Sequence, residues 1–207
     1  AVESLNRAIA IEPNYVDAHY NLAITFKDLN QLDDAVKSYQ KVIEINPNFA
    51  QAYNNLGNLL KDLGQTDEAI KNYQKAIEIN PNFAHAYNNL GNAFKDLEKL
   101  IEAVSCYEKA IEGNPNFSEA HNNLGNAFKD LGELDNAINS YQKATHLDYK
   151  LYEAYYNLGV VFIQLKRFNK AIESFQTAIE INPNFSQSYN NLGSALMSQG
   201  RVKESIK

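Results

Sequence analysis

The sequence predicts an all-α protein, an α-solenoid built from antiparallel helix pairs. The first observation behind this prediction is a fixed period, because Pro13, Pro47, Pro81 and Pro115 are each 34 residues apart and Pro183 lies two periods further on. The second is the segment Asn-Pro-Asn-Phe, which recurs around most of these prolines. The third is that apolar residues between the prolines recur at helical spacing. Short repeats of this kind stack on their neighbours to bury one continuous core.

Taking each proline as position 32 of a repeat divides the chain into five full repeats and two partial ones. The full repeats are 16–49, 50–83, 84–117, 118–151 and 152–185, and the partial repeats are 1–15 and 186–207. We therefore expect one repeat array over residues 1–207. Both ends fall inside a predicted second helix, so we expect the sequence to be a piece of a longer chain.

The first helix of each repeat is predicted from one apolar face. In repeat two, Tyr53, Leu56, Gly57 and Leu60 recur at i, i+3, i+4 and i+7, which is the spacing of a single helix face. Gly64 follows this stretch, and a glycine at that place is typical of a helix end.

The second helix of the repeat follows from a second stripe. Ala69, Tyr73 and Ala76 recur at i, i+4 and i+7. Pro81 ends this helix, because proline disfavours helical geometry in the residue before it. Neither helix can bury its apolar face alone, so we expect the two helices to pack on each other and on the next repeat.

These positions resemble the tetratricopeptide repeat family. The family pattern has an aromatic residue at position 4, Leu-Gly at positions 7–8, an aromatic residue at 11, Ala at 20, an aromatic residue at 24, Ala at 27 and Pro at 32. Repeat three carries the whole set: Tyr87, Leu90, Gly91, Phe94, Ala103, Tyr107, Ala110 and Pro115. Within the family, the recurring segments Asn-Leu-Gly and Pro-Asn-Phe are most similar to those in the repeats of O-linked N-acetylglucosamine transferases.

The chain departs from the family pattern at a few positions. Ala23 replaces the glycine of repeat one, His19 and His121 replace the aromatic residue at position 4, and Tyr149 replaces the proline of repeat four. None of these changes breaks the period. The resemblance implies a right-handed superhelix in which the first helix of each repeat lines a concave, protein-binding surface.

The helix face opposite the apolar one carries a row of asparagines. At about 100° per residue, positions 2, 6, 9 and 13 share that face. Position 6 is Asn in every repeat, namely Asn21, Asn55, Asn89, Asn123, Asn157 and Asn191, and position 9 adds Asn58, Asn92 and Asn126. A carboxamide donates and accepts hydrogen bonds, as a peptide unit does. We therefore predict an Asn-lined groove that binds an extended peptide or protein segment; the alternative is a solvated polar face.

Other side chains flank the asparagines. Position 12 supplies Lys27, Lys61, Lys95 and Lys129. We expect Lys61, Lys95 and Lys129 to border the groove; the alternative is that each forms a solvated pair with a neighbouring aspartate. Repeat five instead places Tyr156, Val160 and Ile163 at i, i+4 and i+7. This spacing predicts an apolar strip that contacts ligand side chains, unless the strip packs against a neighbouring helix.

Composition and motifs argue against other functions. A net charge of -6 disfavours nucleic acid, and the sequence holds no apolar run of the roughly 20 residues that span a membrane. The single cysteine, Cys106, favours a reducing compartment, so we expect a cytoplasmic location. His19 and His121 lie three repeats apart and cannot share a metal ion. We expect no catalytic residue, no metal and no cofactor.

Three hypotheses therefore remain. The favoured one is a peptide- or protein-binding scaffold. A second is the substrate-presenting arm of a larger enzyme, such as a protein O-glycosyltransferase. A third is an array that associates end to end, for which we expect Leu5, Ile9, Leu196 and Val202 to be exposed at the two ends.

Overall fold

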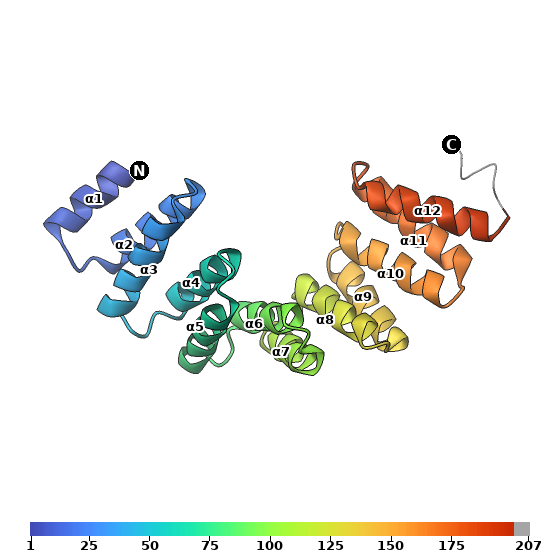
Figure 1. Cartoon of the computed structure of the whole chain (residues 1–207), viewed down its shortest axis with the longest axis horizontal. Helices are drawn as coiled ribbons and strands as arrows, with labels where there is room; N and C mark the ends of the chain where they lie inside the picture. Colours follow the sequence, from blue (N-terminus) through green and yellow to red (C-terminus); the bar gives the residue numbers. More distant parts are fainter. Residues whose placement is uncertain (201–207) are drawn as a thin grey trace. The chain divides into compact units, whose positions relative to one another are not determined.

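The computed structural model describes residues 1–200, which form twelve α-helices and no strand (Figure 1). The predicted all-α repeat fold is therefore confirmed. The helices group into two compact units, Ala1–Leu97 and Glu98–Lys207. The helices of the first unit are α1 (Val2–Ile11), α2 (Val16–Asp28), α3 (Leu32–Ile45), α4 (Ala50–Asp62), α5 (Thr66–Ile79) and α6 (Ala84–Asp96). Those of the second are α7 (Leu100–Gly113), α8 (Ser118–Asp130), α9 (Leu134–Leu147), α10 (Tyr152–Gln164), α11 (Phe168–Ile181) and α12 (Ser186–Ser198).

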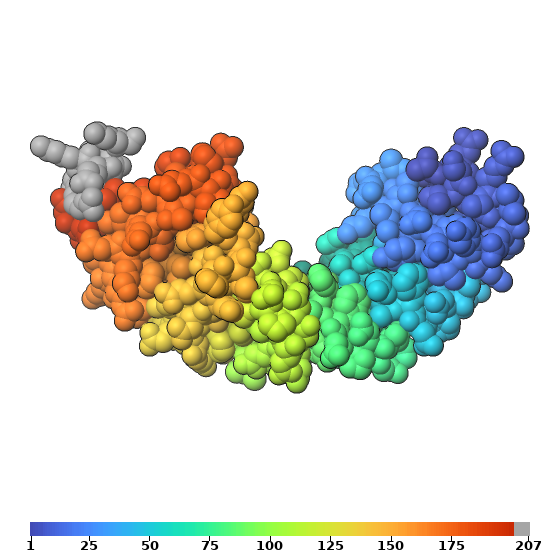
Figure 2. All heavy atoms as spheres, turned by 180° about the vertical axis from the view of Figure 1, so that it is seen from behind, coloured from blue at the N-terminus to red at the C-terminus, as the bar shows by residue number. Residues whose placement is uncertain are grey.

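Each unit is a stack of helix pairs in sequence order. The pairs α2–α3 and α4–α5 pack in the first unit, and α8–α9 and α10–α11 pack in the second. In addition, α4 contacts α6, α8 contacts α10 and α10 contacts α12, so the first helices of successive repeats lie next to one another within a unit. In the space-filling view the helices of each unit form a continuous packed body (Figure 2).

Close contact between the paired helices explains the Leu-Gly of the repeat. A Cβ atom placed on Gly57 would lie 2.6 Å from Cε1 of Tyr73, and one on Gly125 would lie 2.6 Å from Cε1 of Tyr141. The rings at position 24, including Tyr73 and Tyr141, are fully buried. The missing side chain at position 8 therefore leaves the space that the aromatic ring of the second helix occupies.

The turn between the two helices of a repeat has one residue with positive φ, always at position 15. These residues are Asn30, Gly64, Glu98, Gly132, Lys166 and Gly200, with φ between 55° and 80°. Glycine adopts this left-handed conformation without strain, whereas a side chain such as that of Lys166 disfavours it by about 1–2 kcal/mol.

The turn between repeats is held by a side chain rather than by proline alone. Oδ1 of Asn46 accepts a hydrogen bond from the backbone N–H two residues later, and Asn80, Asn114 and Asn182 do the same in their repeats. In repeat four, which lacks the proline, Asp148 Oδ1 accepts from the N–H of Lys150 at 2.9 Å. This local bond preserves the turn.

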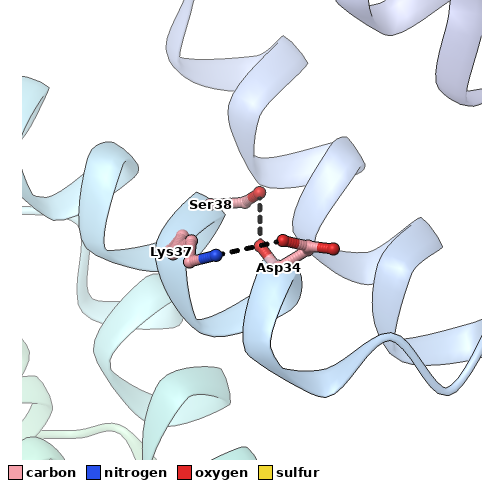
Figure 3. Close-up of polar contacts among 3 residues, drawn as sticks. All are labelled: Asp34, Lys37 and Ser38. Atoms are coloured by element: carbon pink, nitrogen blue, oxygen red, sulfur yellow. Dashed lines mark hydrogen bonds and ion pairs between the residues drawn. The ribbon is translucent and has the colours of Figure 1, made fainter.

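The second helices accommodate small polar residues at position 23. Ser38 Oγ donates to the backbone carbonyl of Asp34 at 2.8 Å, and Lys37 forms an exposed ion pair with the Asp34 carboxylate (Figure 3). Ser140 and Ser174 make the same bond to the carbonyl four residues earlier. Cys106 occupies this position in repeat three and is buried, so its size suits the packing there.

The expectation about the chain ends was partly wrong. Leu196 is buried at 5% exposure, because α12 packs its apolar face on α11. Leu5 and Ile9 are half-buried, since α1 packs on α2. Val202 lies outside the described residues.

Candidate functional site

All the side chains predicted to bind a ligand lie on the first helices of the repeats. They are Asn21 on α2; Asn55, Asn58 and Lys61 on α4; Asn89, Asn92 and Lys95 on α6; Asn123, Asn126 and Lys129 on α8; Tyr156, Asn157 and Val160 on α10; and Asn191 on α12. Asn21 is exposed and the others are half-buried. Contacts of α4 with α6, and of α10 with α8 and α12, place these residues in one row in each unit.

The position-6 asparagines join neighbouring repeats. Nδ2 of Asn89 donates to Oδ1 of Asn54 at 3.0 Å, Asn54 Nδ2 donates to Asn55 Oδ1 at 3.2 Å, and Asn55 Nδ2 donates to the Tyr20 hydroxyl at 2.8 Å. These three bonds form one chain of hydrogen bonds across three repeats. Each bond contributes on the order of 1 kcal/mol, so these side chains stabilise the stack as well as lining its surface.

The second unit uses the same connection. Asn157 Nδ2 donates to Asn122 Oδ1 at 3.1 Å, and Asn191 Nδ2 donates to the Tyr156 hydroxyl at 3.1 Å. In both units the donor at position 6 reaches the position-5 residue of the preceding repeat. Asn21 makes no such bond, because its partner position would precede residue 1.

The position-9 asparagines are held by the buried tyrosines of the second helix. The Tyr73 hydroxyl donates to Asn58 Oδ1 at 2.8 Å, and the Tyr141 hydroxyl donates to Asn126 Oδ1 at the same distance. Burial raises the pKa of both tyrosines above its ordinary value, so the hydroxyls remain protonated donors at every physiological pH. These bonds fix the orientation of the two carboxamides.

At the junction between α4 and α6, one side-chain amide donor and one side-chain carbonyl acceptor have no partner within residues 1–200. Asn58 uses its oxygen for Tyr73, and its Nδ2 group makes no hydrogen bond within residues 1–200. Asn89 uses its Nδ2 group for Asn54, and its oxygen likewise has no partner there. The pair of Asn126 and Asn157 repeats this arrangement in the second unit. The α4–α6 and α8–α10 junctions therefore each present one donor and one acceptor.

The junction between α4 and α6 is hollowed. A hollow of about 270 Å³ is lined by Asn58, Asn89 and Asn92, together with Lys27, Lys61, Asp62 and Tyr73. Lys61 Nζ lies 2.9 Å from Asp96 Oδ2 on the next first helix. Lys61 is half-buried and Asp96 is exposed, so this partly solvated ion pair contributes little to stability.

Repeat five differs from this pattern. The Tyr156 ring packs on Phe175 at 5.9 Å and on Phe185 at 5.1 Å between ring centroids. The half-buried Tyr156 therefore packs against the rings of α11 and of the turn before α12. Val160 and Ile163 also pack partly against the core, but they line a separate hollow of about 170 Å³ between α10 and α12.

Comparison with known proteins identifies the repeat. Sequence profiles described as TPR repeat match residues 1–29, 25–64, 57–98, 91–132 and 125–166. Profiles described as tetratricopeptide repeat match residues 152–185 and 174–207. The chain belongs to the tetratricopeptide repeat (TPR) family. No curated protein sequence matches it.

Several solved structures are similar to the chain. The crystal structure of YrrB, described as a TPR protein with an unusual peptide-binding site, is 27% identical with a TM-score of 0.71, and the match covers 92% of this chain and 98% of YrrB. MamA is 25% identical with a TM-score of 0.71, over 80% of this chain and 97% of MamA. A thermophilic TPR protein of Thermus thermophilus is 22% identical with a TM-score of 0.70, over 88% of this chain and 99% of its own.

Cys106 and His121 of this TPR chain are held in the packing of the repeats. Burial raises the pKa of the Cys106 thiol to about 11, so it is not a nucleophilic thiolate at neutral pH. His121 is buried, and one of its ring nitrogens lies 3.1 Å from the Pro115 carbonyl oxygen. Residues 1–200 contain no group of three or more His, Cys, Asp or Glu side chains that could hold a metal ion. None of their helices is long and apolar enough to cross a membrane.

Sequence reasoning missed the structural use of the asparagines. It treated the position-6 side chains as facing away from the packing, whereas Asn55, Asn89, Asn157 and Asn191 each bond to the repeat before. A signal was present in the sequence, because the residue at position 5 is always Asn or Tyr and can accept a hydrogen bond through an oxygen.

Proposed function

We propose that the chain is a protein-binding scaffold that holds an extended peptide segment by its main chain. The observation that carries this proposal is the pair of unused amide groups at the repeat junction. Nδ2 of Asn58 can donate to a peptide carbonyl, and Oδ1 of Asn89 can accept from a peptide N–H. Both side chains line the 270 Å³ hollow, so one peptide unit could engage both.

The occurrence of the same pair in both units favours a group that every peptide carries, the main-chain amide, over one particular small molecule. Asn126 and Asn157 offer the same donor and acceptor in the second unit. Packed helices lie about 8–10 Å apart, and an extended chain rises about 3.3 Å per residue. A peptide that lies along one unit would therefore meet each repeat with about three of its residues.

The internal hydrogen bonds support binding by fixing these carboxamides in advance. Tyr73 holds Asn58, and Asn54 holds Asn89. A ligand that binds a fixed side chain avoids the free energy of ordering it, which is about 0.5–1.5 kcal/mol for each flexible group. Recognition through the main chain would give affinity with little dependence on the ligand sequence.

A charge-matched pair of variants tests the proposal. N58D/N126D keeps the oxygen that Tyr73 and Tyr141 require but removes the Nδ2 donor from both junctions. The control, Q74E/N139D, adds the same charge at exposed positions on the second helices α5 and α9. The probe is a twelve-residue peptide selected from a random display library against the whole chain.

We expect N58D/N126D to bind the selected peptide at least tenfold more weakly, about 1.4 kcal/mol, with Q74E/N139D close to the parent. Calorimetry measures both affinities. Equal binding by the parent and N58D/N126D would show that these donors do not hold the ligand.

A further inference from the structure

A second hollow lies at the junction of α10 and α12 and differs in chemistry from the first. It measures about 170 Å³ and is lined by Val160, Ile163, Gln164, Asn191, Ser194 and Ser198. Counted within the repeat, these residues include positions 9, 12 and 13 of repeat five and positions 6 and 9 of repeat six. The hollow at α4 and α6 is lined by the same five positions of repeats two and three. The two hollows are therefore equivalent places in the fold.

Three residues of α10 that line this hollow are less polar or less charged than their equivalents on α4. Val160 stands where the other junction has Asn58, Ile163 stands for Lys61, and Gln164 stands for Asp62. A lysine and an aspartate are thus replaced by an aliphatic and a neutral side chain. The two helices that line the hollow add little charge, because α12 carries none and α10 carries only Glu153.

The valine at position 9 of repeat five is accompanied by a change of the core residue that position 9 contacts in repeats two and four, the aromatic residue at position 24. In repeats two and four the position-24 tyrosine needs the oxygen of the position-9 asparagine. Repeat five has Phe175 at position 24 and Val160 at position 9, so the hydroxyl and its acceptor are absent together. The valine leaves no buried donor unpaired.

Most polar groups on the wall of this hollow are already used. The Ser194 hydroxyl donates to the Asn190 carbonyl at 3.1 Å, and the Ser198 hydroxyl donates to the Ser194 carbonyl at 2.9 Å. Nδ2 of Asn191 donates to Tyr156. Among the lining residues, only Gln164, at the edge and exposed, retains an amide with no partner within residues 1–200. The hollow therefore offers an apolar surface and few donors.

We propose that the hollow between α10 and α12 is a specificity pocket for one uncharged, apolar side chain of a bound peptide. A cavity of roughly 150 Å³ accommodates a molecule the size of benzene, so 170 Å³ suits a leucine- or phenylalanine-sized group. A charged side chain would lose water there without gaining a partner. This pocket rests on the proposed function, and it adds the ligand chemistry that main-chain contacts leave unspecified.

Capped amino acids test the pocket without requiring a peptide ligand. The probe is N-acetyl-leucine methylamide, titrated into the whole chain with methyl-labelled valine and isoleucine and followed by nuclear magnetic resonance. We expect the Val160 and Ile163 methyl signals to shift with a dissociation constant on the order of 1 mM to 10 mM, as suits about a dozen heavy atoms. The glutamate and lysine analogues should shift these signals at least tenfold less at equal concentration.

Two variants block the pocket in different ways. V160N/I163K installs the side chains of the polar junction, and S194L fills the hollow from the exposed wall of α12 with an apolar group. S194L should reduce the leucine-induced shifts of the Val160 and Ile163 methyl signals at least tenfold. V160N/I163K lacks both methyl probes, so the backbone amide signals of Ser194 and Ser198 are followed in it and in the parent, and their leucine-induced shifts should fall at least tenfold in the variant. Circular dichroism identifies any loss of fold, and S194L provides an independent test if V160N/I163K does not fold.

The outcomes separate the two proposals. Equal shifts from the leucine, glutamate and lysine analogues, or leucine shifts that persist in folded S194L, would overturn the pocket. The main-chain proposal would stand if the selected peptide still required Asn58 and Asn126. If the pocket proved specific for leucine but N58D/N126D bound the selected peptide as well as the parent does, the pocket would be retained and main-chain binding rejected.

Discussion

The hydrogen bond between Tyr141 and Asn126 gives a quantitative test of how the groove is ordered. The Tyr141 ring is fully buried, and its hydroxyl donates to Asn126 Oδ1 at 2.8 Å. In N126V the hydroxyl keeps its place without a partner, which we expect to cost about 1–3 kcal/mol. In Y141F only the bond is lost, because half-buried Asn126 can turn to water; we expect a loss of about 1 kcal/mol.

The double variant N126V/Y141F reproduces the residues that repeat five uses, Val160 and Phe175. Removing both partners leaves no unpaired group, so we expect it to be more stable than N126V alone. The predicted coupling between the two sites is about 1–2 kcal/mol.

Urea denaturation followed by circular dichroism measures the four proteins of this cycle. Amide hydrogen exchange in α9 supplies a local value, because a repeat array unfolds in parts and its stability is close to a sum over repeats and interfaces. Additive effects of the two substitutions, with a coupling below about 0.3 kcal/mol, would refute the idea that Tyr141 fixes the Asn126 carboxamide.

Three other substitutions have defined expected results. S188A should raise the free energy of unfolding by about 1 kcal/mol, because Ser188 is fully buried and its hydroxyl has no partner within residues 1–200; thermal denaturation that shows a loss would contradict this. Burial lowers the pKa of His121 below its ordinary 6.5, so the unfolded chain takes up the proton first and stability falls as the pH drops through about 6.5 and below. H121Y should reduce this acid sensitivity in paired melts at about pH 7.5 and about pH 5.5, on either side of the ordinary histidine pKa, and an unchanged difference would reject the assignment. K166G should stabilise by about 1 kcal/mol by relieving a left-handed lysine, and a lower melting temperature would show that the turn is not strained.

The helix pairs were predictable because each repeat carries its own local signals. The spacing of Tyr53, Leu56 and Leu60 predicted a first helix, and α4 buries Leu56 and Leu60. Proline marked the end of each second helix, but the turn also depends on the position-31 side chain. Asp148 shows this, because it holds the turn of repeat four where no proline is present.

The groove was harder to predict because its bonds link residues 35 positions apart. The sequence identified Asn89 as a surface residue, but its bond to Asn54 depends on how closely α4 and α6 pack. Tyr156 was predicted within an apolar strip, and only the positions of Phe175 and Phe185 place its ring in the stack. Which rings lie next to Tyr156 can be seen only in the three-dimensional structure.

The central claim, that a peptide is held by its main chain, is tested most directly by changing the ligand. In the selected peptide, each N–H is replaced in turn by an ester oxygen, which removes one donor and leaves the side chains unchanged; an alanine scan serves as the comparison. We predict that an ester replacement opposite the acceptor that the peptide contacts, Asn89 in one unit or Asn157 in the other, weakens binding about tenfold. One main-chain position should be sensitive opposite each of these acceptors, while most alanine substitutions have little effect. Ester replacements that leave affinity unchanged throughout, with binding dominated by several side chains, would contradict the account.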